Sequence, residues 1–90
     1  MLEQTVTLVN PLGLHARAAA KLVRCSAQFR SSIILHNPKA NATANAKSIL
    51  SLLALAASFG VTLDLTIEGA DEQDAADAIA QIFATGFGEI

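Results

Sequence analysis

The spacing of apolar residues changes several times between an alternating and a helical period. Residues 2–9 (LEQTVTLV) alternate and are rich in β-branched side chains, which predicts a strand. Residues 16–28 repeat every three to four positions and predict a helix. Polar residues follow one side of this helix at Arg17, Lys21, Arg24 and Gln28. The opposite side, with Ala19 and Leu22, is then expected to face a core.

Two further strands and a second helix follow. Residues 32–37 (SIILHN) predict a strand, the sequence NPKAN predicts a turn, and residues 42–46 predict a weak strand at a sheet edge. A helix is expected to begin at Ser48 and to run through SILSLLALAASF until Gly60 ends it. Leu52, Leu55 and Ala56 are expected to face the sheet.

The last third of the chain predicts one more strand and one more helix. Residues 61–67 (VTLDLTI) alternate, with the apolar positions facing inward. Asp71 is then expected to cap the final helix, and Gly86 to follow its end. The order is therefore βαββαβα, which predicts an α+β fold with a four-stranded antiparallel sheet and three helices on one face. We expect residues 1–90 to form a single domain.

Composition narrows the class of protein. Of the 90 residues 52% are hydrophobic, but no apolar run approaches the roughly 18 residues that span a bilayer, so we expect no membrane insertion. The first residues lack the pattern of a signal peptide, and the single cysteine, Cys25, cannot form an internal disulfide. These features predict a cytoplasmic protein. The scattered histidines His15 and His36 and this cysteine do not predict a metal site.

Charge is distributed unevenly along the chain. All six basic residues lie between 17 and 47, whereas seven of the eight acidic residues lie at 64 or later. A basic region without aromatic residues to stack on bases does not favour a nucleic-acid partner. It fits docking to an acidic protein surface better. No Ser-His-Asp set or carboxylate pair indicates a hydrolytic enzyme.

The sequence NPLGLHARAAAKLV places a histidine, His15, at the start of the first predicted helix, two residues before Arg17. A helix start carries partial positive charge and unpaired N–H groups that bind phosphate. Neutral imidazole is a competent nucleophile at pH 7. These residues could form and hold a phosphohistidine. The spacing alone also fits a surface histidine that caps a helix, and it leaves that alternative open.

The segments GLHARAAAKLV, NAKSIL and IEGADEQDA together resemble the HPr family, the phosphocarriers of the bacterial phosphotransferase system. The resemblance covers nearly the whole chain and implies an open-faced β-sandwich. It implies that Enzyme I, charged by phosphoenolpyruvate, phosphorylates His15 on Nδ1, and that the group passes to a IIA domain. Arg17 would contact the phosphoryl group. The protein would be a covalent carrier rather than an enzyme, would need no cofactor, and is expected to be a monomer.

This chain departs from the family pattern at two places. Many members have proline after the arginine, where this chain has Ala18, and the turn NPKAN is longer than in many relatives. Proline lacks an N–H group that would be unpaired at a helix start anyway. Ala18 therefore adds a donor near the phosphoryl position, and we expect altered tuning rather than loss of activity.

Ser48 has two interpretations. It is a good N-cap for the helix that begins at Ile49, which is a purely structural role. The resemblance implies a second role, because Ser48 matches the regulatory serine that HPr kinase/phosphorylase modifies in some lineages. A phosphate there would be favourable beside Lys47, but it would place negative charge on a surface that acidic partners approach.

The helix after Ser48 has more apolar residues than one face can bury. If Leu52 faces the sheet, then Ile49, Leu50 and Leu53 point to solvent and predict a docking site, with Lys21, Arg24 and Lys47 around it. The alternative is that they are core residues. An alternative for the whole protein is a regulatory member of the family, acting in nitrogen or carbon signalling without direct sugar uptake.

Overall fold

The computed structural model describes residues 1–90 and has the expected βαββαβα order. Its strands are β1 (Leu2–Thr7), β2 (Ser32–Asn37), β3 (Ala42–Asn45) and β4 (Thr62–Glu68). Its helices are α1 (Ala16–Ser26), α2 (Ile49–Leu53) and α3 (Glu72–Ala84), and a 3₁₀ turn, η1 (Gly86–Gly88), follows. Gly86 comes after the C-cap Thr85 with a φ of 60°, which confirms its predicted place at the end of α3.

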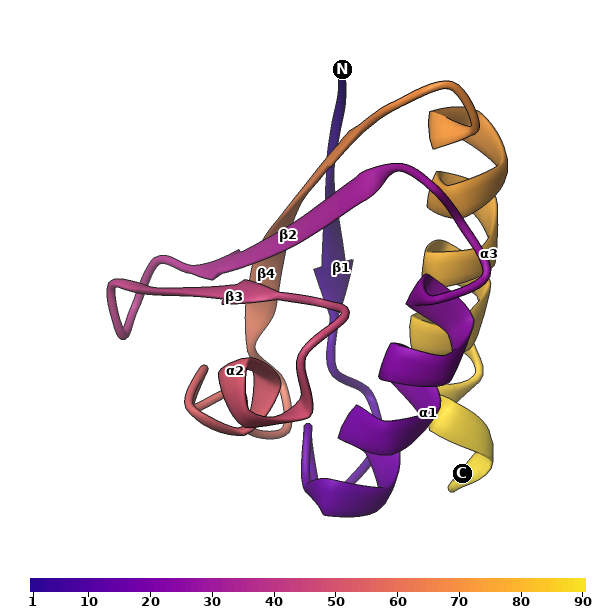
Figure 1. Ribbon diagram of the computed structural model, residues 1–90. Coiled ribbons are helices and arrows are strands. Elements are labelled where there is room, and N and C mark those ends of the chain that lie inside the picture. The colour runs from indigo at the N-terminus through magenta and orange to yellow at the C-terminus, as the bar shows by residue number, and fades with distance from the viewer.

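The four strands form one antiparallel sheet in the order β1-β4-β2-β3. The short strand β3 lies at an edge, as predicted. The helices cover one face of the sheet (Figure 1). The other face carries partly or fully exposed residues such as Thr5, His36 and Asp64, so the prediction of a one-sided antiparallel sheet is confirmed. No helix is long and apolar enough to cross a membrane.

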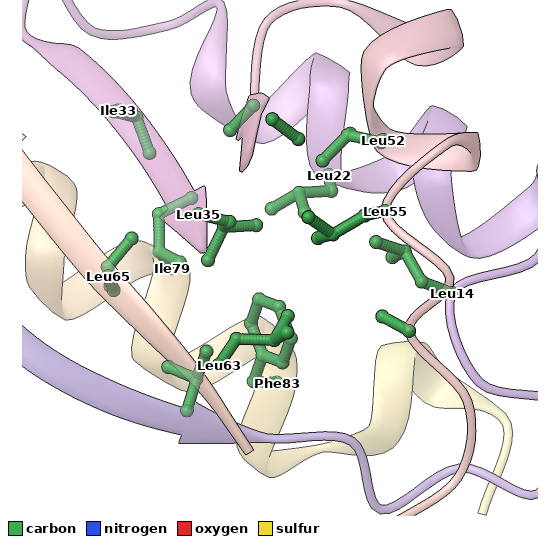
Figure 2. Packing of buried hydrophobic residues seen from close by; sticks show 14 of the residues in the cluster. Leu14, Leu22, Ile33, Leu35, Leu52, Leu55, Leu63, Leu65, Ile79 and Phe83 are labelled. Carbon is green, nitrogen blue, oxygen red and sulfur yellow. The ribbon is translucent and has the colours of Figure 1, made fainter. Parts of the chain in front are cut away.

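The core lies between the sheet and the helices. Leu35, Leu63 and Leu65 from the sheet meet side chains of all three helical regions (Figure 2). These are Leu22 of α1, Leu52 of α2 and Leu55 just after it, and Ile79 and Phe83 of α3. Each fully buried side chain of this size contributes roughly 1.5–3 kcal/mol, so this packing decides which face each helix turns inward.

The second helix is much shorter than the predicted range of residues 48–59. It ends at Leu53, and Ala56 has a φ of 58°, outside the helical region. Backbone carbonyls beyond the helix bond to other parts of the chain: Asn37 Nδ2 donates to Leu55 O (3.0 Å), and Leu14 N donates to Ala57 O (2.9 Å). These tertiary bonds override the strong helix propensity of the alanine-rich sequence. Ala56, expected to face the sheet, is consequently exposed, whereas Leu52 and Leu55 are buried as predicted.

Asp71 stands at the N-cap position of α3, but its side chain makes no capping bond, so that prediction is wrong. Its carboxylate instead accepts hydrogen bonds from the N–H groups of Arg30 and Ser31 and from the Ser31 hydroxyl. The Ser31 hydroxyl, followed by the Arg30 N–H, lowers the pKa of Asp71 to about 2. Asp71 therefore ties the connection between α1 and β2 to the start of α3.

Candidate functional site

The loop before α1 is fixed by a buried asparagine and a glycine. Asn10 is fully buried, and its Nδ2 donates to Gly13 O at 2.7 Å. Gly13 has a φ of 64°, and a Cβ there would lie 2.8 Å from Ala57 O. Only glycine fits this position without strain, because the loop packs directly against the segment after α2. The next residues, Leu14 and His15, are thereby delivered to the start of α1.

His15 occupies the N-cap position of α1 but does not cap the helix. Its backbone is extended, with φ −79° and ψ −178°, and its side chain bonds no N–H group of the first turn. The imidazole Nε2 lies instead 2.6 Å from Oε2 of Glu89, and the His15 side chain is 28% exposed. The alternative of a capping surface histidine is therefore wrong.

Glu89 reaches His15 because the end of the chain folds back onto α1 (Figure 1). Phe87 is buried in an edge-to-face contact with Phe83, with ring centroids 5.1 Å apart. Lys21 Nζ donates to Phe87 O at 2.6 Å. The sequence interpretation placed Gly86 at the end of α3 and assigned no role to the residues after it. Their only signal was a phenylalanine between two glycines after α3, a pattern compatible with a tight return of the chain.

Glu89 is ionised at neutral pH. A hydrogen bond from Asn10 (Nδ2 to Oε1, 3.0 Å), the bond with His15 and the charge of Lys21 together lower the pKa of Glu89. An ionised carboxylate can only accept hydrogen bonds. Nε2 of a neutral His15 must therefore carry the proton and donate it, which leaves the lone pair on Nδ1, the nitrogen that can act as a nucleophile.

Arg17 lies beside His15 and Glu89 but bonds to neither of them. It is exposed, forms no ion pair or hydrogen bond, and lines the same open hollow as His15. The complete lining of that hollow is Pro11, Leu12, His15, Ala16, Arg17, Lys21, Gly88 and Glu89. The first N–H groups of α1 have no partners within the helix. A guanidinium and free N–H groups beside a nucleophilic nitrogen suit an incoming phosphoryl group.

The other basic residues predicted for the site differ in their exposure and in their hydrogen bonds. Arg24 is exposed on α1. Lys21 and Lys47 are half-buried, and each ammonium group already donates to a backbone carbonyl: Lys21 to Phe87 and Lys47 to Phe29, the latter at 2.7 Å. Both lysines hold the chain in place, but only Lys21 lines the hollow beside His15, whereas Lys47 reaches the chain just beyond the end of α1.

Ser48 and the apolar side chains after it lie as the sequence predicted. Ser48 Oγ accepts a hydrogen bond from Ser51 N at 3.3 Å, which confirms the N-cap. Leu52 is buried, whereas Ile49, Leu50 and Leu53 are exposed by 40%, 77% and 43%. We refer to these three residues as the apolar patch of α2. The sequence interpretation missed two further exposed apolar side chains, Leu12 and Phe59.

The remaining histidine and the cysteine lie in different environments. His36 Nδ1 lies 3.0 Å from the Thr43 hydroxyl, between neighbouring strands of the sheet. Cys25 is half-buried against the core, and burial raises the pKa of its thiol. A raised pKa disfavours the thiolate, the reactive form of cysteine.

Comparisons with known proteins point to one family. The family model described as "PTS HPr component phosphorylation site" matches residues 2–85. The chain is 42% identical to the phosphocarrier protein HPr of Cupriavidus necator over 89 residues, which cover 99% of this chain and 98% of that protein. It is 38% identical to the phosphocarrier protein NPr of Proteus mirabilis over 84 residues, 93% of this chain and 92% of that one.

A solved structure extends the likeness to the fold. The crystal structure of HPr-C-His from Thermoanaerobacter tengcongensis superposes with a TM-score of 0.92 at 39% identity, covering 100% of this chain and 99% of that one. The resemblance seen in the sequence motifs is thus confirmed over the full chain. The chain belongs to the HPr family, the phosphocarrier proteins of the phosphotransferase system, which relay a phosphoryl group and are not themselves catalytic enzymes.

Proposed function

We propose that His15 accepts a phosphoryl group from Enzyme I, which takes it from phosphoenolpyruvate, and passes it to a IIA domain in the cytoplasm. One observation supports this most strongly. His15 is partly exposed at the start of α1, and a carboxylate engages its Nε2. Nδ1 can then attack phosphorus without first losing a proton.

Arg17 is the residue that we propose to hold the transferred group. A phosphoryl group brings about two negative charges, and a guanidinium can bind two of its oxygens at once. Arg17 forms no competing ion pair and lines the hollow beside His15. It can therefore move to the phosphoryl group without breaking a bond that the fold needs.

Mass spectrometry of the protein after reaction with Enzyme I and phosphoenolpyruvate tests the assignment of His15. We expect one added phosphoryl group that is lost in acid, as an N–P bond should be. His15→Ala should abolish the addition, whereas His36→Ala, the matched control, should keep it. Phosphorylation of His15→Ala by Enzyme I to the normal extent would contradict the proposal.

We propose that the apolar patch of α2 is the centre of the surface that docks Enzyme I and IIA domains. The three side chains are exposed although they are apolar, and α2 contacts α1, the helix that carries Arg17, Lys21 and Arg24. Arg17, Lys21, Arg24 and Lys47 would form the rim that steers acidic partners. Lys47→Glu should mainly slow association, and the effect should be greater at low salt than at high salt.

We propose that phosphorylation of Ser48 by HPr kinase/phosphorylase regulates this docking. Ser48 is half-buried and comes immediately before the apolar patch of α2, so a phosphate there would place charge next to the patch. Ser48→Asp should lower the rate at which Enzyme I phosphorylates His15. Ser32→Asp, an exposed position on β2, is the control. Equal rates for the two variants would remove the regulatory role.

A regulatory member of the family is the second candidate, and the identity to NPr proteins favours it. Two NPr sequences match this chain at 38% and 34% identity. The two functions differ in the IIA domain that receives the phosphoryl group. Phosphorylated protein should be mixed with IIA domains of sugar permeases and with IIA domains that have no attached permease. Transfer to the sugar-specific domains supports the carrier function, and transfer only to the others supports regulation.

A further inference from the structure

Glu89 joins His15 to the loop before α1 through a continuous set of hydrogen bonds. Its Oε2 pairs with His15 Nε2 at 2.6 Å, and its Oε1 accepts from Asn10 Nδ2 at 3.0 Å. The same Asn10 amide donates to Gly13 O, and Asn10 is fully buried. The glutamate side chain is only 15% exposed. Both oxygens are thus held by groups whose own positions are fixed by the fold.

We infer that Glu89 is a positioning residue for phosphoryl transfer: it selects the tautomer of His15 that has its lone pair on Nδ1. This inference rests on the proposed function of His15. A free neutral imidazole exchanges between two tautomers, of which only one can attack through Nδ1. A carboxylate bonded to Nε2 stabilises that one, as the aspartate of a serine protease triad does for its histidine.

The chemistry balances without a proton transfer. The Nδ1 lone pair forms the N–P bond while the bond between phosphorus and the donor breaks, and its electron pair stays with the donor. The proton on Nε2 remains there, so the phosphorylated ring becomes a cation paired with Glu89. In the onward step the N–P bond breaks, the electron pair returns to Nδ1, and the ring is neutral again. Glu89 thus stabilises the positive ring that forms with the phosphoryl group.

The charges around the pair fit this role. Arg17 and Lys21 are the cations of α1 that line the hollow, and Lys21 is bonded to Phe87 O, two residues before Glu89. Neither forms an ion pair with Glu89. The carboxylate is therefore available to the imidazole, while the cations stay near the place that the phosphoryl oxygens would occupy.

Asn10 makes Glu89→Gln a sharper test than simple removal of the side chain. Asn10 Nδ2 is a donor, so the side-chain atom of residue 89 that faces it, Oε1 in the glutamate, must be an oxygen. The amide oxygen of the glutamine would face Asn10, and its NH₂ group would face His15. Nε2 would then have to accept a hydrogen bond, which moves the ring proton to Nδ1 and blocks the nucleophile. Glu89→Ala would impose neither tautomer.

The experiment compares the full-length protein with Glu89→Gln and Glu89→Ala. The ¹⁵N chemical shifts of the imidazole nitrogens report the tautomer of His15 in the unphosphorylated protein, and His36, which is bonded to Thr43, is the reference in each spectrum. We expect the Nε2–H form in the original protein, the Nδ1–H form in Glu89→Gln and a mixture in Glu89→Ala. His36 should not change.

Rates of phosphorylation by Enzyme I supply the second readout. Glu89→Ala should be slower than the original protein, and Glu89→Gln slower again by roughly tenfold, a ratio that one hydrogen bond of ordinary strength can set between two tautomers. A purely structural role predicts the reverse order, because glutamine preserves the shape that alanine removes. That reverse order, or an unchanged tautomer in Glu89→Gln, overturns the inference.

The two readouts also separate this inference from the proposed function. The tautomer is measured without any phosphoryl donor, so it holds or fails whether or not His15 is the acceptor. Phosphorylation at another residue would contradict the proposed function and leave the spectra as expected. Normal phosphorylation of His15 with an unaltered tautomer in Glu89→Gln would contradict only the role of Glu89.

Discussion

The starts of α1 and α2 use the same backbone position in opposite ways. His15 and Ser48 both occupy the N-cap, and both have an extended backbone. Ser48 turns its side chain to the helix and accepts the N–H of Ser51. His15 leaves the first N–H groups of its helix free and bonds instead to Glu89, 74 residues away in sequence.

This difference shows what a helix start needs if it is to handle an anion. A capping side chain satisfies the free N–H groups and stabilises the helix, but it then occupies the place where an anion would bind. At α1 the donors stay free, and His15 is held from outside by the end of the chain. The start of α2 is capped by its own side chain, whereas the start of α1 keeps its donors available for the phosphoryl group that we propose His15 to carry.

The largest expected effect on stability comes from the buried face of α2, which packs against the core. Leu52 is fully buried and Leu53 is 43% exposed. Leu52→Ala should lower the free energy of unfolding by about 2–5 kcal/mol, the usual result of truncating a buried leucine. Leu53→Ala should lower it by less than about 0.5 kcal/mol, as surface changes usually do, while weakening the binding of Enzyme I. Urea denaturation and a binding titration measure the two effects, and comparable losses of stability would contradict the assigned face.

Removing Arg17 should damage the chemistry at α1 and spare the fold. Arg17→Ala should slow phosphoryl transfer by roughly 10- to 150-fold, since a charge-assisted hydrogen bond contributes about 1.5–3 kcal/mol. Its free energy of unfolding should change by less than about 0.5 kcal/mol, because the side chain is exposed and unbonded. Arg30→Ala, another exposed arginine, is the control for net charge. Equal transfer rates for both variants would show that Arg17 does not contact the phosphoryl group.

Removing the cap of α2 tests the structural side of the comparison. Ser48→Ala should lower the free energy of unfolding by about 0.5–2 kcal/mol. Ser48→Gly should lower it by only about a few tenths of a kcal/mol. The bond to Ser51 N is long at 3.3 Å, so a value near the lower end is expected. Thermal melts of both variants check this. A melt of Ser48→Ala that matches the original protein would mean that the cap has no structural role.

The start of α3 is a third case, in which the N-cap side chain stabilises a loop. Asp71 has a folded-state pKa of about 2, below its reference value of 3.8, so its bonds stabilise the protein above pH 3.8 and are lost as the pH falls toward 2. Asp71→Asn should therefore lower the melting temperature most at neutral pH, and the difference should shrink as the pH falls through that window. Asp74→Asn removes a charge from the same turn without touching Ser31 or Arg30, and is the control for net charge.

The sequence predicted features that depend on neighbouring residues. The alternating strands, the apolar side of α1 and the Ser48 cap all follow from local spacing. The end of α2 does not, because the carbonyls of Leu55 and Ala57 just beyond it accept hydrogen bonds from Asn37 and Leu14, which are distant in sequence. The prediction that Asp71 caps α3 was wrong for the same reason, because its carboxylate accepts hydrogen bonds from Arg30 and Ser31, which are also distant in sequence.

The candidate site divides in the same way. His15 and Arg17 could be singled out from a motif of a few residues at the start of one helix. Glu89 could not, because a carboxylate near the end of the chain has no spacing relationship with a histidine near its beginning. Its contact depends on Phe87 packing against Phe83, which becomes evident only when the fold is complete.

The most direct test of the central claim is the nitrogen to which phosphorus is bonded. The protein labelled with ¹⁵N should be phosphorylated by Enzyme I and phosphoenolpyruvate and then examined by ³¹P and ¹⁵N NMR. We predict a single phosphoryl group on Nδ1 of His15, with Nε2 protonated and bonded to Glu89. A phosphoryl group on Nε2, the nitrogen that the carboxylate occupies, or one carried by a different residue, would contradict the account.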